Sequence, residues 1–262
     1  MNKEAPIGIF DSGVGGISVL GRLTKLLPRE NYIYYADTAR FPYGDKSCEV
    51  VKAGVLEAAA TMAEHGIKML VVACNTATAA AIEDLRAKYD FPVLGIEPAL
   101  KPAVEAAAGK SVALIATSLT LKEKKFRQLF EAYREKGEIV NLEAPGLADL
   151  VENGHYRDEA ARAYLSQLFD GVKADTVVLG CTHYLFLWEL IREFFPAAEI
   201  IDGGSGLARN VCRTLMEQRL LKAEGEGSMT VLSSAEASFL PRFDSFFQDI
   251  LSILALLSHK MS

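Results

Sequence analysis

Short runs of apolar and β-branched residues recur along the chain, and longer stretches with helical periodicity separate them. Eight runs have the length and composition of strands: Ile7–Phe10, Tyr32–Ala36, Met69–Ala73, Val93–Ile96, Val112–Ala116, Glu138–Leu142, Thr176–Gly180 and Glu199–Asp202. The stretches between them that have helical spacing include Cys48–His65, Ala77–Lys88 and Leu121–Lys136. Strands that alternate with helices are typical of βαβ units and mainly parallel sheets. The pattern therefore predicts an α/β fold.

Landmarks at the ends of the predicted strands repeat at an almost constant spacing. Two corners that begin with a cysteine, Cys74 and Cys181, lie 107 residues apart. Ser12 and Ser118 lie 106 residues apart. The repeat predicts two pseudo-symmetric three-layer α/β domains with mainly parallel sheets, and an active site in the cleft between them.

The connection between the two domains is expected near Glu97–Pro102, where two prolines interrupt the pattern. The C-terminal segment has no counterpart in the repeat, and its strand-like Met229–Leu232 and the apolar helix after it are expected to return to the first half. We therefore assign residues 1–97 together with about 210–262 to the first domain, and residues 98–209 to the second.

Composition and charge exclude several classes of protein. The 262 residues carry 28 basic and 34 acidic side chains, and the net charge of −6 disfavours binding to nucleic acid through phosphate neutralisation. No apolar run reaches the roughly 18 residues of a membrane span, and the N-terminus lacks a signal-peptide pattern. The four cysteines form no CxxC pair, so neither a disulfide framework nor a metal site is expected. We expect a soluble, cytoplasmic protein that binds neither nucleic acid nor membrane.

Small polar residues gather directly after the predicted strands. Parallel sheets bind ligands at the carboxyl ends of their strands, so these residues are the first candidates for a site. Candidate donors and acceptors at these positions are Asp11, Ser12, Asn75, Thr76, Thr117, Thr182 and His183. Such groups suit a zwitterionic amino acid, because its ammonium and carboxylate both need partners.

Cys74 and Cys181 each follow a strand and precede a predicted helix, whose N-terminus would lower the pKa of the thiol. The alternative is that both are small buried hydrophobes, which is the expectation for Cys48 and Cys212. Two matched thiols that face one cleft suit a racemase, because one base removes a proton from a stereocentre and the other group returns one to the opposite face.

Two ionisable residues are placed to assist these thiols. Asp11 could orient or deprotonate Cys74, and His183 could do the same for Cys181. The alternatives are that Asp11 forms an Asx turn or caps a helix, and that His183 is a structural histidine at the start of a helix.

Four motifs together resemble those of the glutamate racemase family, which belongs to the cofactor-independent aspartate/glutamate racemase superfamily. They are Asp-Ser-Gly-Val-Gly-Gly at 11–16, Pro-Tyr-Gly at 42–44, Cys-Asn-Thr-Ala at 74–77 and Gly-Cys-Thr-His-Tyr at 180–184. The resemblance runs from about residue 6 to about residue 210. The chain departs from the family pattern at Leu185 and Phe186, where the family usually has Pro-Leu.

The resemblance implies that the protein interconverts L- and D-glutamate without a cofactor or metal and supplies D-glutamate for peptidoglycan. It implies that Cys74 and Cys181 transfer the proton, with Asp11 and His183 as auxiliary groups. The implied substrate contacts are Asp11, Ser12, Tyr43, Gly44, Asn75, Thr76, Thr182 and His183. Glu152 matches an acidic position implicated in some members, and its alternative is a solvated charge near the end of a helix.

Other functions stay open at this point. They are racemisation of aspartate or another amino acid on the same fold, hydrolysis by a single nucleophilic cysteine, and amino-acid binding without catalysis. A homodimer is a further open expectation. The apolar residues of the C-terminal segment, Phe246 among them, suit core packing or a partner surface.

Overall fold

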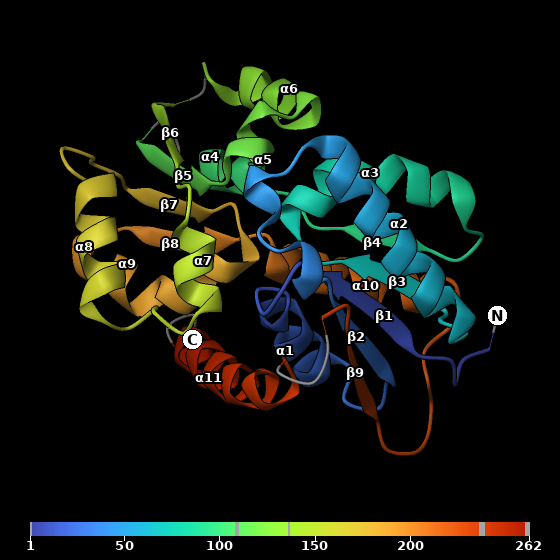
Figure 1. Cartoon of the computed structure of the whole chain (residues 1–262). Coiled ribbons are helices and arrows are strands. Elements are labelled where there is room, and N and C mark those ends of the chain that lie inside the picture. The colour runs from blue at the N-terminus through green and yellow to red at the C-terminus, as the bar shows by residue number, and fades with distance from the viewer. Residues whose placement is uncertain (1, 108–109, 136, 236–238, 260–262) are drawn as a thin grey trace.

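The computed structural model of the chain describes residues 2–107, 110–135, 137–235 and 239–259, and it contains two parallel β-sheets (Figure 1). The strands of sheet A, in spatial order, are β4 (Val93–Gly95), β3 (Met69–Val72), β1 (Ile7–Asp11), β2 (Tyr32–Ala36) and β9 (Met229–Ser233). The strands of sheet B are β6 (Ile139–Glu143), β5 (Val112–Ala116), β7 (Thr176–Leu179) and β8 (Glu199–Asp202). Every pairing is parallel.

The two sheets repeat one topology. Four strands of sheet A run in the order β4-β3-β1-β2, and sheet B has the matching order β8-β7-β5-β6. The strands β5 to β8 begin 105, 107, 107 and 106 residues after β1 to β4. This agreement confirms the predicted pseudo-symmetric α/β fold. The additional strand β9 pairs with β2 at the edge of sheet A.

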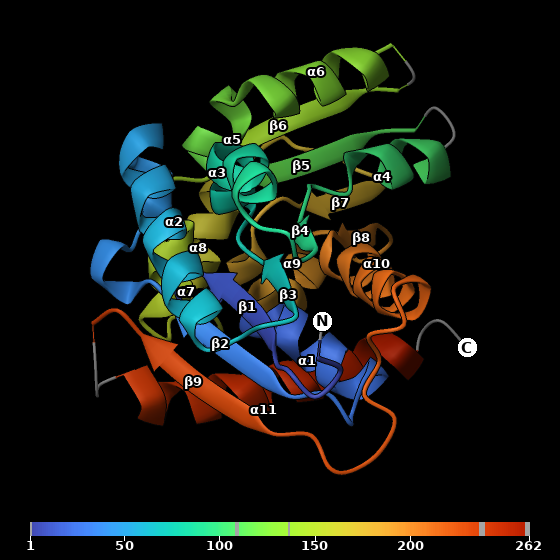
Figure 2. The same ribbon diagram turned by 90° about the vertical axis from the view of Figure 1, so that its right-hand side faces the viewer.

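Helices cover both faces of each sheet (Figures 1 and 2). Their bounds are α1 (Ile17–Leu26), α2 (Cys48–Glu64), α3 (Asn75–Lys88), α4 (Leu100–Ala107), α5 (Ser118–Lys122), α6 (Lys124–Tyr133), α7 (Leu147–Glu152), α8 (Glu159–Leu168), α9 (Trp188–Phe194), α10 (Gly204–Glu217) and α11 (Phe239–His259). Short 3₁₀ turns are η1 (Thr38–Arg40), η2 (Tyr43–Asp45) and η3 (Thr182–Leu187).

Alternation along the strands decides which helices each face meets. In β1, Ile7 and Ile9 join a core with α1 and α11, whereas Phe10 points to the opposite face and packs with α2 and α3. The core under α1 continues into the second half through η3 and α9, so apolar packing joins the two sheets. A smaller core under α4 and α6 covers the other face of sheet B.

All of the predicted strands form, and their ends agree to within one residue. The single helix predicted over Leu121–Lys136 is wrong, because Glu123 adopts an extended conformation and separates α5 from α6. The break has a packing reason: α5 contacts η2 and α3, whereas α6 contacts α4 on sheet B, and one straight helix could not reach both. Lys136 lies outside the described residues.

The C-terminal segment returns to the first sheet, where β9 pairs with β2 and α11 packs against α1. Helix α11 also reaches the second half, because Asp249 accepts hydrogen bonds from Tyr156 and Arg157. The division of the chain at residues 97 and 210 stays a prediction.

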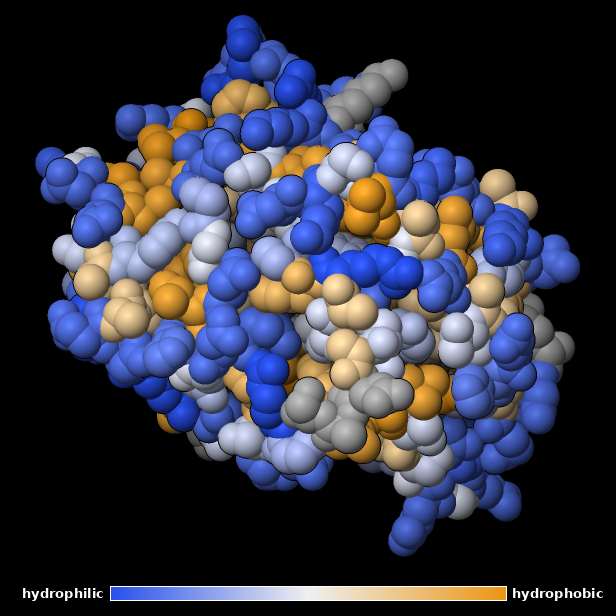
Figure 3. Space-filling view, viewed as in Figure 1, coloured by the Kyte–Doolittle hydropathy of each residue, from blue (hydrophilic) through white to orange (hydrophobic). Residues whose placement is uncertain are grey.

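On the face seen in Figure 1, hydrophobic residues are divided into separate patches among hydrophilic ones (Figure 3). No helix in the described part of the chain has the length and apolar character that a membrane span requires.

The two connections between the sheets pass very close to each other. Gly203 lies at the start of α10, and a Cβ atom added to it would overlap the carbonyl oxygen of Glu97. Gly206 lies in the same helix, and a Cβ atom there would meet nothing within 4 Å among the described atoms. A side chain at position 203 therefore has no room, whereas one at position 206 does.

We expect Gly203→Ala to lower the free energy of unfolding by about 1–3 kcal/mol, because backbone atoms must move to make room. Gly206→Ala is the matched control, and it should raise the free energy of unfolding by about 0.5–1 kcal/mol through helix propensity. Equilibrium urea denaturation of both variants measures the difference. Equal effects of the two substitutions would contradict the close approach.

Candidate active site

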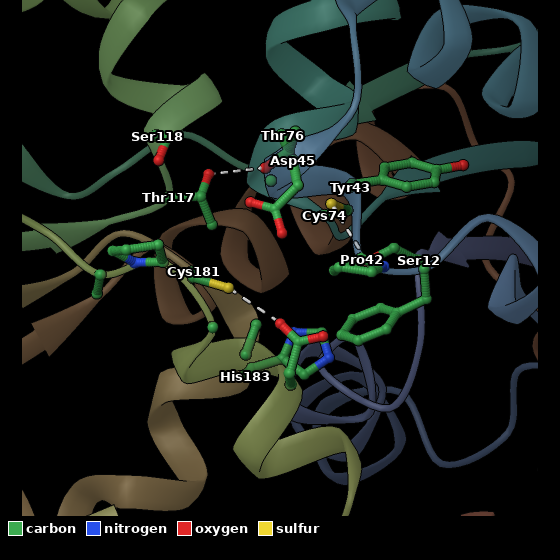
Figure 4. Close-up of a pocket in the computed structure, with 17 residues that line it drawn as sticks. Ser12, Pro42, Tyr43, Asp45, Cys74, Thr76, Thr117, Ser118, Cys181 and His183 are labelled. Atoms are coloured by element: carbon green, nitrogen blue, oxygen red, sulfur yellow. Dashed lines mark hydrogen bonds between the residues drawn. The ribbon is translucent and has the colours of Figure 1, made fainter. Parts of the chain in front are cut away.

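A small cavity lies between the two halves, at the carboxyl ends of β1, β3, β5 and β7 (Figure 4). The predicted site residues that line it are Ser12, Tyr43, Gly44, Cys74, Thr76, Thr117, Cys181 and His183. Cys74 comes from the first half and Cys181 from the second, and they lie on opposite sides of the cavity (Figure 4). The cavity has an interior of about 30 Å³.

Four other predicted residues do not line this cavity. Asp11, Glu152 and Thr182 are buried behind it. Asn75 instead lines a neighbouring cavity of about 300 Å³, and within the described ranges neither its amide nitrogen nor its amide oxygen has a hydrogen-bond partner.

Cys74 is buried at the N-cap position of α3. Its sulfur accepts a hydrogen bond from the Ala77 N–H at 3.4 Å, and its thiol donates to Ser12 Oγ at 3.8 Å. Burial and the nearby Asp11 carboxyl raise the pKa of the Cys74 thiol well above its ordinary value. The expected lowering of its pKa by the helix N-terminus is therefore wrong in direction, because desolvation outweighs the hydrogen bond from Ala77.

Cys181 belongs to a chain of polar contacts. Its sulfur lies 3.7 Å from His183 Nδ1, and His183 Nε2 lies 3.0 Å from Glu152 Oε2. Burial acts to lower the pKa of His183, but hydrogen bonds to Cys181 and Glu152 outweigh it and raise that pKa well above its usual value. His183 is therefore held by one partner on each ring nitrogen.

Glu152 is buried rather than solvated. Burial acts to raise the pKa of its carboxyl group. The hydrogen bond from His183 and the positive charge of His183 outweigh this and hold that pKa below the ordinary value. The Val14 N–H also donates to Glu152, at 2.9 Å. This contact brings the loop after β1 against the second half.

The glycine-rich loop after β1 permits this approach. A Cβ atom at Gly13 would overlap the Glu152 carboxylate, and one at Gly15 would overlap His183 and Thr182. Glycine is therefore required at these two positions by close packing between the halves, rather than by a phosphate-binding role.

Asp11 is fully buried and forms the Asx turn considered from the sequence. Its carboxylate accepts hydrogen bonds from the Gly13 N–H at 3.0 Å and from Thr182 Oγ1 at 3.2 Å. Burial raises the pKa of Asp11 to about 6. In the part of the chain that the structure describes, its hydrogen bonds go to these groups rather than to Cys74.

Tyr43 lines the cavity without presenting its hydroxyl to it. The hydroxyl donates to Asp37 Oδ2 at 2.5 Å, on the side away from the cavity (Figure 4). The segment around Tyr43 thus offers Gly44 and backbone groups to a ligand.

Several lining residues were missed in the sequence. They include Phe41, Asp45, Ser118 and Asp149. The Phe41 ring packs against His183, with ring centres 5.5 Å apart. Burial and the charge of Asp45 raise the pKa of Asp149. Phe41 and Asp45 directly flank the Pro-Tyr-Gly motif, so their positions in the sequence could have identified them as lining residues. No motif lies next to Asp149.

Among the residues that the structure describes, no three histidine, cysteine or acidic side chains converge closely enough to hold a metal ion.

Comparisons with known proteins agree with this fold. The sequence model of the Asp/Glu/Hydantoin racemase family matches residues 16–210. A glutamate racemase of Clostridium botulinum (strain Okra / Type B1) is 46% identical over 239 residues, which cover 89% of this chain and 93% of the relative.

Solved structures give the same result. Glutamate racemase from Thermus thermophilus, in complex with β-chloro-D-alanine, has a TM-score of 0.79 and 34% identity, and the match covers 95% of this chain and 94% of that one. Escherichia coli glutamate racemase, in complex with L-glutamate and the activator UDP-MurNAc-Ala, has a TM-score of 0.81 and 30% identity, with 94% and 95% covered.

The fold and the paired cysteine corners thus define an α/β racemase with two similar halves. The chain belongs to the Asp/Glu/Hydantoin racemase family, and its curated relatives are glutamate racemases.

The raised pKa of Asp11 makes stability depend on pH. The folded state holds this proton up to about pH 6, whereas the ordinary pKa of an aspartate carboxyl group is 3.8, so the stabilisation is complete below pH 4 and is lost as the pH rises through 6. Asp11→Asn removes the buried charge. The amide oxygen can accept from the Gly13 N–H, and the amide nitrogen can donate to Thr182 Oγ1, which reverses the direction of that hydrogen bond. We expect its free energy of unfolding to exceed that of the wild type at pH 7.5 by up to about 3 kcal/mol, with little difference near pH 4.

Urea denaturation between pH 4 and pH 7.5 measures this dependence. Asp175→Asn is the control with the opposite sign, because hydrogen bonds from Ser111 lower the pKa of this exposed carboxyl group. Its removal should destabilise the protein at pH 7.5 and less so as the pH falls. A gap between Asp11→Asn and wild type that does not widen with pH would contradict the buried charge.

Proposed function

We propose that this protein interconverts L- and D-glutamate by two-base proton transfer, with Cys74 and Cys181 as the two bases. The observation that carries the proposal is the placement of two thiols, from equivalent corners of two similar halves, on opposite sides of one cavity. A stereocentre between them has one thiol on each face, which is the arrangement that racemisation needs.

Several observations support glutamate as the substrate. The relatives that match most of the chain are glutamate racemases, and the Escherichia coli enzyme is described with L-glutamate bound. The cavity is lined by hydroxyl groups of Ser12, Thr76 and Thr117, which can bind a carboxylate.

In the proposed reaction, one cysteine acts as thiolate and removes the α-proton, while the other acts as thiol and protonates the opposite face. Cys181 passes its proton to His183, and the Glu152 carboxylate stabilises the imidazolium that results. Cys74 starts as the thiol, in agreement with its raised pKa, and becomes the thiolate after donation.

The reverse direction exchanges the two roles. By family resemblance, Cys181 acts on L-glutamate and Cys74 on D-glutamate. In that direction Cys74 must begin as the thiolate, and we assign Asp11, whose pKa lies near 6 and whose carboxyl group affects the pKa of Cys74, as the group that takes up the Cys74 proton.

Substrate entry requires the halves to separate. An interior of about 30 Å³ has room for about one or two water molecules, which is much less than glutamate occupies. The small cavity leaves little room for water beside the thiols, and this favours proton return to carbon over loss to solvent.

We further propose that the reaction uses no cofactor and supplies D-glutamate for peptidoglycan in the cytoplasm. The remaining substrate contacts are assigned to Gly44 and His183, with Tyr43 contributing through its backbone. Contacts from Asn75 and Thr182, which do not line the cavity, stay predictions. A homodimer stays a prediction, which sedimentation of the purified protein tests.

Loss of either thiol should abolish racemisation. We expect Cys74→Ala and Cys181→Ala each to lower kcat by at least about 100-fold, because general acid–base groups typically contribute 10²–10⁴. The circular dichroism of L- or D-glutamate should decay to zero with the wild type, and the α-carbon should gain deuterium in deuterated water.

Cys48→Ala and Cys212→Ala are matched controls, because these cysteines lie on helices α2 and α10 and do not line the cavity. Both variants should keep wild-type activity. Full activity of Cys74→Ala or Cys181→Ala would rule out the two-base reaction. A cysteine hydrolase would instead need one thiol and form an acyl-enzyme, and a binding protein would bind glutamate without exchanging its α-proton.

A further inference from the structure

Three buried threonines meet beside the cavity, and we call them the threonine triad: Thr76, Thr117 and Thr120. The Oγ1 atom of Thr76 lies 3.1 Å from that of Thr117 and 3.3 Å from that of Thr120, and the last two are 3.0 Å apart. Thr76 is in α3, which follows β3 of sheet A, whereas Thr117 and Thr120 follow β5 of sheet B. The triad therefore joins the two halves next to the substrate site, and Figure 4 shows the contact between Thr76 and Thr117.

The hydrogens of the triad can be counted. Each hydroxyl has one hydrogen to donate. Thr117 donates to Thr120, and its oxygen also accepts the Thr120 N–H at 3.3 Å. All three contacts are hydrogen bonds only if Thr120 donates to Thr76 and Thr76 donates to Thr117. In this closed ring, every hydroxyl hydrogen is already used.

A substrate carboxylate changes this balance. It can only accept hydrogen bonds, so a lining threonine must release its partner in the ring before it can donate to the substrate. Thr76 and Thr117 line the substrate cavity, whereas Thr120 lines the neighbouring cavity. Thr120 is also 1% exposed, which leaves its hydroxyl with the triad.

We propose that Thr120 is a positioning residue that converts the ring into a chain when substrate binds. The proposal rests on the proposed function of the site. Thr76 exchanges its bond to Thr117 for one to the substrate carboxylate, while Thr117 still donates to Thr120 and Thr120 to Thr76. One hydrogen bond is exchanged for another, and none is left unmade. The head-to-tail chain strengthens the final donor, because each bond polarises the next.

The proposal assigns the effect of Thr120 to substrate binding rather than to proton transfer. Thr120→Val keeps the shape of the side chain and removes the hydroxyl. We expect KM to rise about three- to tenfold for both enantiomers, which corresponds to one hydrogen bond, with kcat changed less than about twofold. L- and D-glutamate have equal free energy, so kcat/KM must fall by the same factor in the two directions.

Two variants separate positioning from folding. Thr120→Ser restores the hydroxyl and should restore KM. Thr78→Val is the matched control. Thr78 lies in α3, is buried like Thr120 and lines the same neighbouring cavity. Its hydroxyl, however, donates to the Val72 carbonyl at 3.2 Å and not to the triad. It should leave KM within about twofold of wild type. Thermal melting of each variant checks folding, and Thr120→Ala replaces Thr120→Val if the latter does not fold.

The outcomes distinguish the two proposals. Wild-type protein that does not racemise glutamate would overturn the proposed function and this inference together. An active wild type with unchanged KM in Thr120→Val, a loss of kcat alone, or a failure of Thr120→Ser to restore KM would overturn the role of Thr120 only. Raised KM with rescue by serine and no effect of Thr78→Val supports it.

Discussion

The arrangement of the two halves depends on one buried carboxylate. Glu152 lies in a short helix of the second half, and it accepts hydrogen bonds from Val14 in the first half and contacts His183 beside the cavity. Arg242 of α11 lies 3.5 Å from the same carboxylate. A buried carboxylate is costly unless it is paired, so these three partners compensate the burial of the charge. Packing of the C-terminal helix, closure of the halves and orientation of the His183 ring are thereby joined at one residue.

The electrostatics of the cavity follow from the same burial. Desolvation raises the pKa of Asp11 and of Cys74, whereas Glu152 keeps its charge because His183 and Val14 satisfy it. Acids within one small region therefore hold their protons to different degrees. This difference comes from how many donors each group meets, since all of these groups are buried.

Much of the fold could be predicted because the central strands β1, β2, β3, β5 and β7 are buried on both faces. Such strands are continuous apolar runs, which are recognisable without any partner. The interruption at Glu123 was not predictable, because it arises from contacts of α5 with η2 and α3, which lie 30 or more residues earlier in the chain. Local periodicity does not contain that information.

The same limit applies to the site. Cys74 and Cys181 were found because they follow parallel strands, and the topology alone brings them to one cavity. The Tyr43 hydroxyl points to Asp37, and Asn75 lines a neighbouring cavity. The position of a residue within a motif does not show in which direction its side chain points. For Glu152 the sequence left a solvated charge open as the alternative to a role in the site, because its partners Val14 and His183 are distant in sequence.

The raised pKa of Cys74 also has a consequence for the redox chemistry of the protein. Peroxides and disulfides react with the thiolate form of cysteine, and accessible thiols with low pKa are the ones that become sulfenic acids. Cys74 is buried and retains its proton, so it meets neither condition. Burial therefore protects Cys74 from oxidation while it is the thiol, which is its state before it donates a proton.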